Sequence, residues 1–492
     1  MSRVAREPAA PVSPASPAST SPRTGSIRTA IVAGGGIAGI AAALRLAEAG
    51  VRVTLVETRK KLGGRATSFD DVRTGQRIDN CQHVALGCCV NYPDLLGRLG
   101  ALDKVRWTRE QYWITRGGVV SVVRPRLLPA PLHFSLSMLG AKFIGAADLL
   151  ALARIGPAII RCDRSRYRDI TFAQFLRTHG QPQGLIDRFW SPVVVSACNL
   201  SCERVSAASA LHVFQEGFFA TTHAADMGVS TVPLLELYDR AEAVLTRAGG
   251  TLRLGTGVNK LWPRGIETTT GERLEADAVV CALPFERARE VVDADLRNRD
   301  ARFAAMERME HSPILGVHLV FDRAVMQLPH AVLVEAGTQW LFRKDEAGCV
   351  IHAVISAADE WMALDENAIV ERVVADIRAY FPAAAGAVLL SGRPVKEKRA
   401  TFAPTPNTEA HRPATVGPSG IILAGDYTDC GWPATMEGAT RSGYTAAAAV
   451  LGRSAADLLV PAPAPGRLAR WLGLRVGKSE RMMVAAGAAA RA

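Results

Sequence analysis

Hydrophobic and polar positions in residues 28–57 form three successive patterns. The stretch RTAIVAGGGIAGIAAALRLAEAGVRVTLVE opens on a short apolar run and passes through a glycine cluster into an alanine- and leucine-rich segment. It closes on a second apolar run that ends at Glu57. Short apolar runs bounded by glycine are typical of buried strands, and the longer segment between them has the length of a helix. The pattern predicts strand, glycine turn, helix and strand.

The same reasoning predicts elements along the rest of the chain. Alternating and β-branched runs favour strands, and longer apolar stretches that end at glycine or proline favour helices. The expected elements are a hairpin over 112–123 turning at Gly117 and Gly118, mostly apolar helices over 127–215, a helix over 232–250, strands through 251–284, strands at ILGVHLVFD, QWLFRKD and CVIHAVIS, an amphipathic helix from Asp365 to Pro382, a buried strand near 420 and a helix to about 451.

This order of elements predicts an α/β protein with two interleaved domains. A Rossmann-like nucleotide-binding domain is assembled from three separated segments, and an α+β substrate domain is inserted between them. The expected bounds are 1–27 for an Ala/Pro/Ser-rich disordered leader, 28–110, 241–300 and 416–455 for the nucleotide-binding domain, 111–240 and 301–415 for the substrate domain, and 456–492 for a linker and basic tail.

Composition and charge exclude several classes of protein. The formal net charge is +11, but the positive charge is scattered arginine without a nucleic-acid motif, so no nucleic acid partner is expected. Nine cysteines at irregular spacing, with no C-x-x-C pair, indicate neither a disulfide framework nor a metal site, and favour a reducing compartment. The most apolar stretch, 127–153, is interrupted by prolines and charges, which disfavours a membrane-spanning helix. We expect a cytoplasmic protein.

The glycine cluster of the first stretch has the spacing of a dinucleotide-binding turn. Gly34, Gly36 and Gly39 form G-x-G-x-x-G, with Ile37 and Ala38 between the last two, and an acid follows 18 residues later. The first glycine permits a tight turn, the second lets backbone approach a pyrophosphate, and the third lets the helix pack on the strand. The amino end of the helix offers free N–H groups to the phosphates. A carboxylate at Glu57 can accept from the adenosine ribose hydroxyls.

A second glycine pair follows closely. LGGRATSF places Gly63 and Gly64 where backbone can again approach a ligand, and Arg65 can reach a phosphate or the electron-rich edge of a flavin. An NAD enzyme has no evident need for this second cradle. The pair therefore favours FAD.

A third segment completes the candidate cofactor site. In GIILAGDYTDCGWPATMEGATRSGYTAAAAVL a buried strand ends at Gly425 and Asp426, whose carboxylate can bond a ribityl hydroxyl or the diphosphate. A helix then begins at MEGATRSG, and its amino end can face the flavin pyrimidine carbonyl. The small side chains there keep the ring clear. The cofactor-binding candidates of this part of the chain are Glu437, Gly438 and Ala439, and Val258 is a candidate for backbone contact with adenine.

These three segments resemble the FAD-dependent amine oxidase and phytoene desaturase superfamily over about residues 28–452. Within it, the stretches IDNCQHVALGCC, LLPAPLHF, RFWSPVVVSACNL and GWPATMEGATRSGYTAA are similar to the hydroxysqualene dehydroxylases. The resemblance implies a p-hydroxybenzoate-hydroxylase-like FAD fold and an isoprenoid lipid substrate. It also implies conversion of hydroxysqualene to squalene in hopanoid biosynthesis, in association with squalene-pathway prenyl synthases. Cys81 departs from the wider pattern, in which glycine is common.

Loss of an allylic hydroxyl needs a proton donor, because hydroxide is a poor leaving group. His83 and Asp79 lie in the stretch that superfamily relatives fold near the flavin, so they are our catalytic candidates as an acid or orienting pair. A structural role for His83 stays open, and Cys81, Cys88 and Cys89 are expected to behave as small apolar residues.

Other functions stay open at this point. A phytoene or carotenoid desaturase is the first alternative, because such enzymes also resemble AGDYT and MEGA. An amine oxidase usually needs an aromatic cage, and DCGWPATMEGA has one Trp and no paired Tyr. A non-catalytic flavoprotein scaffold is the fourth hypothesis. The segment 466–487 mixes apolar and basic residues and predicts either an interfacial helix on the inner face of the cytoplasmic membrane or a disordered tail.

Overall fold

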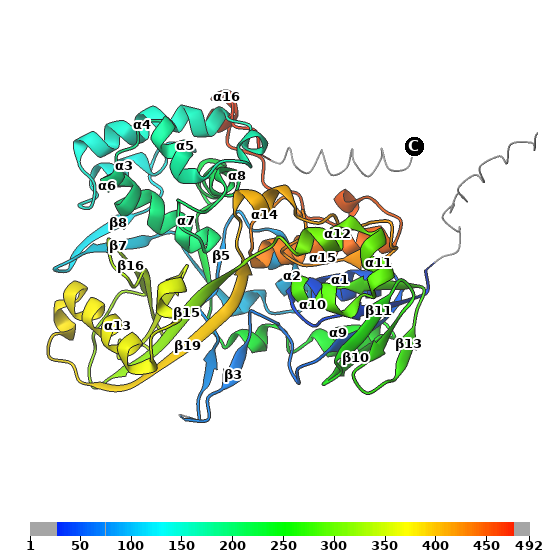
Figure 1. The fold of residues 1–492 in the computed structure, drawn as a ribbon. Coiled ribbons are helices and arrows are strands. Elements are labelled where there is room, and N and C mark those ends of the chain that lie inside the picture. Colours follow the sequence, from blue (N-terminus) through cyan, green and yellow to red (C-terminus); the bar gives the residue numbers. More distant parts are fainter. Residues whose placement is uncertain (1–26, 74, 477–492) are drawn as a thin grey trace, which may run out of the picture.

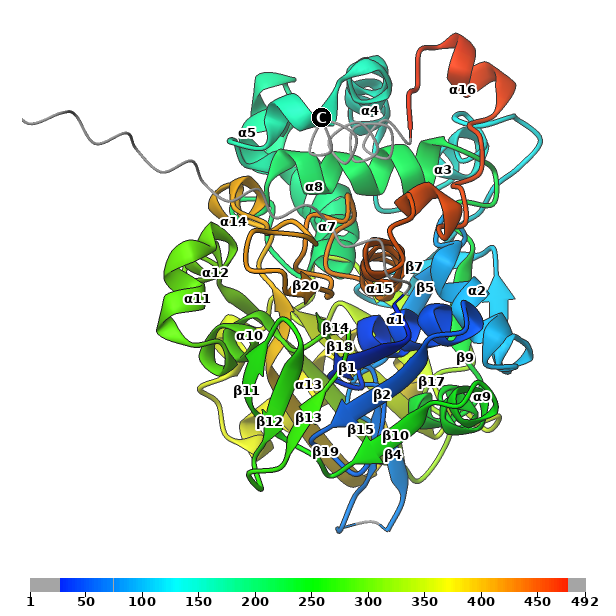
Figure 2. The ribbon, with the colours of Figure 1, turned by 90° about the vertical axis from the view of Figure 1, so that its right-hand side faces the viewer.

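A computed structural model describes residues 27–73 and 75–476. Two sheets lie side by side, and a group of helices covers one end of the molecule (Figures 1 and 2). The expected leader before residue 27 and the end of the tail after residue 476 lie outside the described residues.

The first sheet is parallel and has five strands in the order β10-β2-β1-β14-β20. Their bounds are β1 Thr29–Ala33, β2 Arg52–Glu57, β10 Thr251–Leu254, β14 Ala278–Cys281 and β20 Ile422–Leu423. The strands come from three distant parts of the sequence. Parallel pairing requires crossover connections, and here the substrate-side elements are inserted into those connections. The bounds of the two domains stay a prediction.

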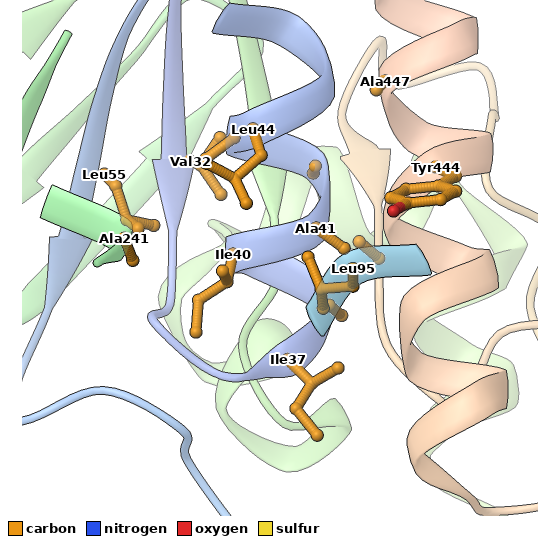
Figure 3. Close-up of a cluster of buried hydrophobic side chains, with 14 of the residues drawn as sticks. Val32, Ile37, Ile40, Ala41, Leu44, Leu55, Leu95, Ala241, Tyr444 and Ala447 are labelled. Atoms are coloured by element: carbon orange, nitrogen blue, oxygen red, sulfur yellow. The ribbon is translucent and has the colours of Figure 1, made fainter. Parts of the chain in front are cut away.

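The helix of the first βαβ unit lies at the centre of its core. α1 (Ile37–Glu48) is buried along nearly its whole length because its alanines let neighbours approach closely. Figure 3 shows Val32 and Leu55 of the sheet on one side of α1, with Leu95 and Tyr444 on the other. The neighbouring helices are α2 (Asn91–Arg98), α9 (Ala241–Arg247) and α15 (Met436–Val450). The strand, helix and strand expected over 28–57 are confirmed.

The second sheet has seven strands in the order β19-β15-β18-β17-β16-β7-β8. Their bounds are β7 Gln111–Thr115, β8 Val119–Val123, β15 His311–Phe321, β16 His330–Leu333, β17 Trp340–Arg343, β18 Val350–Ser356 and β19 Leu389–Phe402. The predicted hairpin and the three β-type runs are confirmed. All neighbours pair antiparallel except β7 and β16. The helix expected after Asp365 is α13 (Glu366–Tyr380), and it packs on one face.

The stretch 127–215 folds into helices around an aromatic core that includes Phe172, Trp190 and Phe214. This confirms the expected apolar helical region. The helices are α3 Ser135–Leu139, α4 Ala146–Arg161, α5 Phe172–Thr178, α6 Gln183–Leu185, α7 Ser191–Cys198 and α8 Ala207–His212, with π-helical turns at Ile186–Trp190 and Val213–Phe219. In both views α4, α5 and α8 gather at the same end of the molecule.

Two sequence expectations differ from the structure. The single helix expected over 232–250 is divided into a 3₁₀ turn, Leu234–Leu237, and α9, because the chain turns at Tyr238, whose ring is buried against the glycine loop at Gly63. The long strand β19 was not expected, because LLSGRPVKEKRATF is too polar to match a buried strand. It lies at the edge of the second sheet, where one side of the backbone needs no strand partner.

Shorter elements complete the fold. The small sheets are β3 Ser68–Asp70 with β4 Arg77–Asp79, β5 Val84–Leu86 with β9 Met227–Ser230 and β6 Val105–Thr108, and β11 Val258–Trp262 with β12 Gly265–Thr268 and β13 Arg273–Glu275. The remaining helices are α10 Phe285–Val291, α11 Ala294–Arg299, α12 Ala301–Met306, α14 Pro406–Ala410 and α16 Arg467–Trp471. Among the described residues, no helix is long and apolar enough to cross a bilayer.

Candidate functional site

The first glycine turn leaves β1 and enters α1 in a conformation that favours glycine. Gly34 has φ +111°, and its N–H donates to the Val56 carbonyl at 2.8 Å. A Cβ there would lie 2.6 Å from the carbonyl oxygen of Ala282. Ile37 and Ala38 then form the first turn of α1, whose leading N–H groups have no intrahelical partner. The turn therefore presents bare backbone donors at a helix amino end, which is a site for phosphate.

The second glycine pair lies directly on the first. The N–H of Gly63 donates to the Gly35 carbonyl at 2.9 Å, and a Cβ on Gly64, whose φ is +61°, would lie 3.0 Å from the Cα of Gly36. Gly39 closes the turn from within α1, where any side chain would meet the Gly34 carbonyl. Two predicted loops thus form one cradle free of side chains.

Glu57 lies beside this cradle, at the carboxyl end of β2. Its carboxylate accepts hydrogen bonds from the backbone N–H groups of Gly35 at 2.7 Å and Arg59 at 2.8 Å. The Thr256 N–H donates to the Glu57 carbonyl at 2.8 Å, which brings the segment leading into Val258 to the same edge. Val258 is buried at the start of β11. Glu57 and the segment leading into Val258 therefore lie together beside the glycine cradle.

The third segment is joined to the second by an ion pair. Arg65 donates from its guanidinium to the buried carboxylate of Asp426, and its carbonyl accepts from the Asn80 side chain at 2.7 Å. Gly425 precedes Asp426 and donates its N–H to the Ser442 hydroxyl at 2.8 Å. The ion pair of Arg65 and Asp426 lies at the edge of the parallel sheet and joins residues from opposite ends of the chain.

The amino end of α15 faces the same region. Thr435 caps the helix by accepting from the Gly438 N–H at 3.0 Å, and the Ala439 N–H donates to the Thr435 carbonyl. The Glu437 side chain, however, is buried against α2 and accepts from the backbone N–H groups of Asn91 and Tyr92 at 2.9 and 2.8 Å. Its carboxylate is therefore committed to α2, and only its backbone can face a cofactor.

Asp79 and His83, expected to act as a pair, are not hydrogen-bonded to each other. The Asp79 carboxylate accepts from the Ser68 hydroxyl at 2.7 Å and the Leu234 N–H at 2.9 Å, which makes it a brace between β3, β4 and the turn after β9. Nδ1 of His83 lies 3.1 Å from the Cys81 carbonyl. A carbonyl only accepts, so Nδ1 carries the proton and Nε2 of the neutral ring is an acceptor.

The protonation state of His83 follows from its surroundings. Burial lowers the pKa of His83, so the ring is neutral near pH 7. A neutral ring with Nε2 unprotonated accepts a proton more readily than it donates one. Burial also raises the pKa of the Cys81 thiol to about 12, which fits an apolar role for that cysteine.

The structure adds one polar residue that the sequence did not distinguish. His212 ends α8 and is buried, and its ring lies 4.6 Å from that of Trp432, three residues before the Thr435 cap. Its Nε2 atom is buried without a hydrogen-bond partner. Burial lowers the pKa of His212 well below its ordinary value. The surrounding sequence is an ordinary apolar helix, so only the fold reveals this position.

The fold and the site together define a flavoprotein class. A side-chain-free cradle, an acid at the end of β2, a buried carboxylate after β20 and the capped amino end of α15 fit FAD. No group of three or more potential metal-ligating side chains lies together in the described part of the chain. The sequence matches the flavin containing amine oxidoreductase family over residues 37–451. The chain belongs to this family, and its cofactor is FAD.

The chain is similar to individual relatives and to solved structures. The chain is 27% identical to zeta-carotene desaturase of Synechocystis sp., over 87% of this chain and 98% of that protein. It is 24% identical to 15-cis-phytoene desaturase of Narcissus pseudonarcissus, over 88% of this chain and 81% of the relative. Among solved structures, putrescine oxidase bound to putrescine superposes with a TM-score of 0.65 at 16% identity, over 87% and 99% of the two chains. Cyclohexylamine oxidase from Brevibacterium oxydans has a TM-score of 0.61 at 18% identity, with the same coverage. These structures confirm the fold.

Proposed function

We propose that this FAD-dependent oxidoreductase exchanges a hydride with an allylic carbon of a polyisoprenoid hydrocarbon. The observation that carries the proposal is the similarity to carotenoid desaturases along almost the whole chain, which includes the second sheet and its helices. Cys81 follows Asn80, whose side chain donates to the Arg65 carbonyl at 2.7 Å, and it packs with Met227, Phe342 and Val354 from three strands in a buried apolar cluster. Apolar surroundings of this kind suit a hydrocarbon better than a charged amine.

Desaturation is the direction that the relatives favour. When bound, FAD supplies the two-electron acceptor or donor. Formation of a double bond removes one hydride and one proton from adjacent carbons, so the protein must provide a base. Nε2 of neutral His83 is such an acceptor, since its Nδ1 proton is held by the Cys81 carbonyl. We therefore propose that His83 takes the proton in this direction.

Reductive dehydroxylation of hydroxysqualene to squalene is the second candidate. The four stretches similar to hydroxysqualene dehydroxylases support it, and so does the unpartnered Nε2 of His212. In this direction the C–O bond breaks, a proton joins the departing hydroxyl to form water, and a hydride takes its place on carbon. A hydrocarbon offers no hydrogen-bonding group to His212, whereas an allylic alcohol does.

One anaerobic experiment separates these directions. The purified protein is reduced with dithionite and given hydroxysqualene, and in parallel the oxidised protein is given phytoene, zeta-carotene or putrescine. Flavin absorbance and extracted products are followed together. Squalene with flavin reoxidation establishes dehydroxylation, and a new conjugated polyene with flavin bleaching establishes desaturation. Bleaching by putrescine alone, or no turnover in any arm by flavin-loaded protein, would overturn the proposal.

Two single substitutions sharpen the result. His83→Gln removes the proton acceptor and is expected to slow desaturation about 100-fold or more, with little effect on dehydroxylation. His212→Phe keeps the ring volume and removes Nε2, and is expected to impair only the alcohol substrate. Equal losses for both substrates in both variants would show that neither residue distinguishes the directions.

A further inference from the structure

Exposed apolar side chains are concentrated in one stretch of the chain. Half of the large hydrophobic residues that are exposed in the described chain lie between residues 119 and 150. Leu127 is 97% exposed and Leu139 66%, and Trp471 from the C-terminal segment is 81% exposed. Isolated exposed leucines need no explanation, but a concentration of this kind indicates an interaction surface.

The segments that carry these residues are neighbours. Arg161 at the end of α4 donates to the Leu472 carbonyl at 3.1 Å, and a Cβ on Gly466 would lie 3.7 Å from Ala130. The Ser137 hydroxyl of α3 donates to the Arg124 carbonyl at 2.8 Å. Both views place α3, α4 and α16 at the same end of the molecule (Figures 1 and 2). We define the apical patch as Leu127, Leu132, Leu136, Leu139, Leu150 and Trp471.

The apical patch is held on a firm base. The Arg126 N–H donates to the His133 carbonyl at 2.8 Å, which closes the loop that projects Leu127. His133 itself is fully buried beneath this loop. On the other side, Ala469 and Leu474 pack against Ile160 and so secure the segment that carries Trp471. The apolar tips are therefore presented by ordered backbone.

The charged residues in the segments that carry the apical patch are mostly basic. Asp148 is the only acidic residue in the stretches 119–161 and 461–476, and it is buried and paired with Arg188 at 2.9 Å. The exposed basic residues of these stretches are Arg124, Arg126, Lys142, Arg154, Arg161, Arg467, Arg470 and Arg475. Arg124 is paired with Glu110 of the neighbouring strand. The surface thus combines projecting leucines and a tryptophan with a cationic surround.

We propose that the apical patch docks the protein on an anionic lipid bilayer, with Leu127, Leu139 and Trp471 entering the interface. Basic side chains then lie at the level of the lipid phosphates, and the amphipathic indole is suited to this boundary. The proposal rests on the proposed function and deepens it, because a polyisoprenoid substrate is dissolved in the membrane. A protein partner would be expected to oppose carboxylates to the arginines, whereas a bilayer offers both phosphates and hydrocarbon.

The test uses the full-length holoprotein and vesicles without substrate. Flotation is measured with phosphatidylcholine vesicles and with vesicles that also contain phosphatidylglycerol. We expect binding to the anionic vesicles, weakening as salt is raised. The triple variant L127S/L139S/W471S is expected to bind these vesicles at least about tenfold more weakly than the unsubstituted protein. The matched control V388S/L390S changes two other exposed apolar residues, 56% and 64% exposed, and should bind as the unsubstituted protein does.

Retained flavin absorbance verifies that each variant is folded. The proposal is overturned if the unsubstituted protein does not float with anionic vesicles, or if the triple variant floats as well as the control. A dimer that only the triple variant dissolves, without flotation, would assign the surface to protein contact instead. Turnover of detergent-dispersed substrate by a protein that binds no vesicles would reject docking and keep the function. Vesicle binding without any turnover would keep docking and reject the proposed function.

Discussion

At the scale of single residues, side chains that were expected to act separately lie together in the structure. Arg65 and Asp426 are 361 positions apart, and each was expected to reach the cofactor by itself, yet they form one ion pair. Glu57 meets the expectation of an acid beside the glycine turn, because a carboxylate at the end of a strand next to β1 faces that turn whatever the rest of the fold does. The Asp79 carboxylate accepts from the Ser68 hydroxyl and from the Leu234 N–H of a distant turn, both at Oδ1, while Oδ2 lies 3.7 Å from the Lys344 ammonium, so its catalytic role stays a prediction.

Glu57→Ala tests the proposed adenosine contact. Loss of an acceptor for charged hydrogen bonds is expected to weaken FAD binding by about 2 kcal/mol, or roughly 30-fold. The ratio of flavin to protein after purification and a fluorescence titration of the apoprotein measure it. Glu48→Ala, an exposed acid at the end of α1, is the control. Stoichiometric flavin in purified Glu57→Ala would reject the assignment.

Buried histidines predict acid sensitivity. Burial lowers the pKa of His133 and of His330 from 6.5 to about 4. Between these pH values the unfolded chain binds protons at both histidines that the folded chain does not bind. Their contribution is fully present above pH 6.5 and is lost as the pH falls towards 4, by about 2 kcal/mol each at pH 5. Urea unfolding between pH 7 and 5 should show this loss. His133→Gln should flatten the slope, and an unchanged slope in this variant would contradict the role given to His133.

At the scale of elements, local pattern decided most of the outcome. The βαβ unit, the hairpin and α13 follow from periodicity and capping, which act over a few residues; Asp365, for example, accepts from the Ala368 N–H at 2.8 Å. The polar strand β19 was missed because its pairing with β15 gives it order that its own composition does not indicate. The helix expected over 232–250 was divided for the same kind of reason, since Tyr238 is placed by its contacts with another segment.

Glu437 couples two helices, and its removal should be felt in stability. The buried carboxylate accepts from the first N–H groups of α2 and from the Asn91 side chain at 2.8 Å. Glu437→Ala is expected to cost about 3 kcal/mol, because buried donors lose their acceptor. Glu437→Gln keeps one acceptor and should cost less. Thermal unfolding of the two variants checks this order, and an unchanged Tm for Glu437→Ala would contradict it.

At the scale of the whole molecule, the end of the chain returns to the helical end. Ala469 and Leu474 cover Ile160 and Ala220, which belong to segments centred more than 200 residues earlier. The C-terminal segment was expected to be a linker and tail, and its part up to residue 476 is instead packed against α4.

Removing the chain after residue 460 should therefore destabilise the protein. The deletion uncovers Ile160 and Ala220, with an expected cost of about 2 kcal/mol and a greater tendency to aggregate. Thermal unfolding and size-exclusion chromatography measure both effects. Deletion after residue 476 is the control, since it keeps the packed residues. Equal stability of the two truncated forms would contradict the role given to this segment.

The sequence by itself determined the α/β class, FAD as cofactor and the glycine cradle, because glycine spacing and hydrophobic periodicity act through neighbouring residues. Only the tertiary structure decided that the Glu437 carboxylate binds α2, that Nδ1 of His83 lies at the Cys81 carbonyl, and that the segments carrying Leu127 and Trp471 are neighbours. Those outcomes depend on burial and on hydrogen bonds between segments hundreds of residues apart. No local sequence pattern encodes which distant residue will pack against or hydrogen-bond to a given side chain.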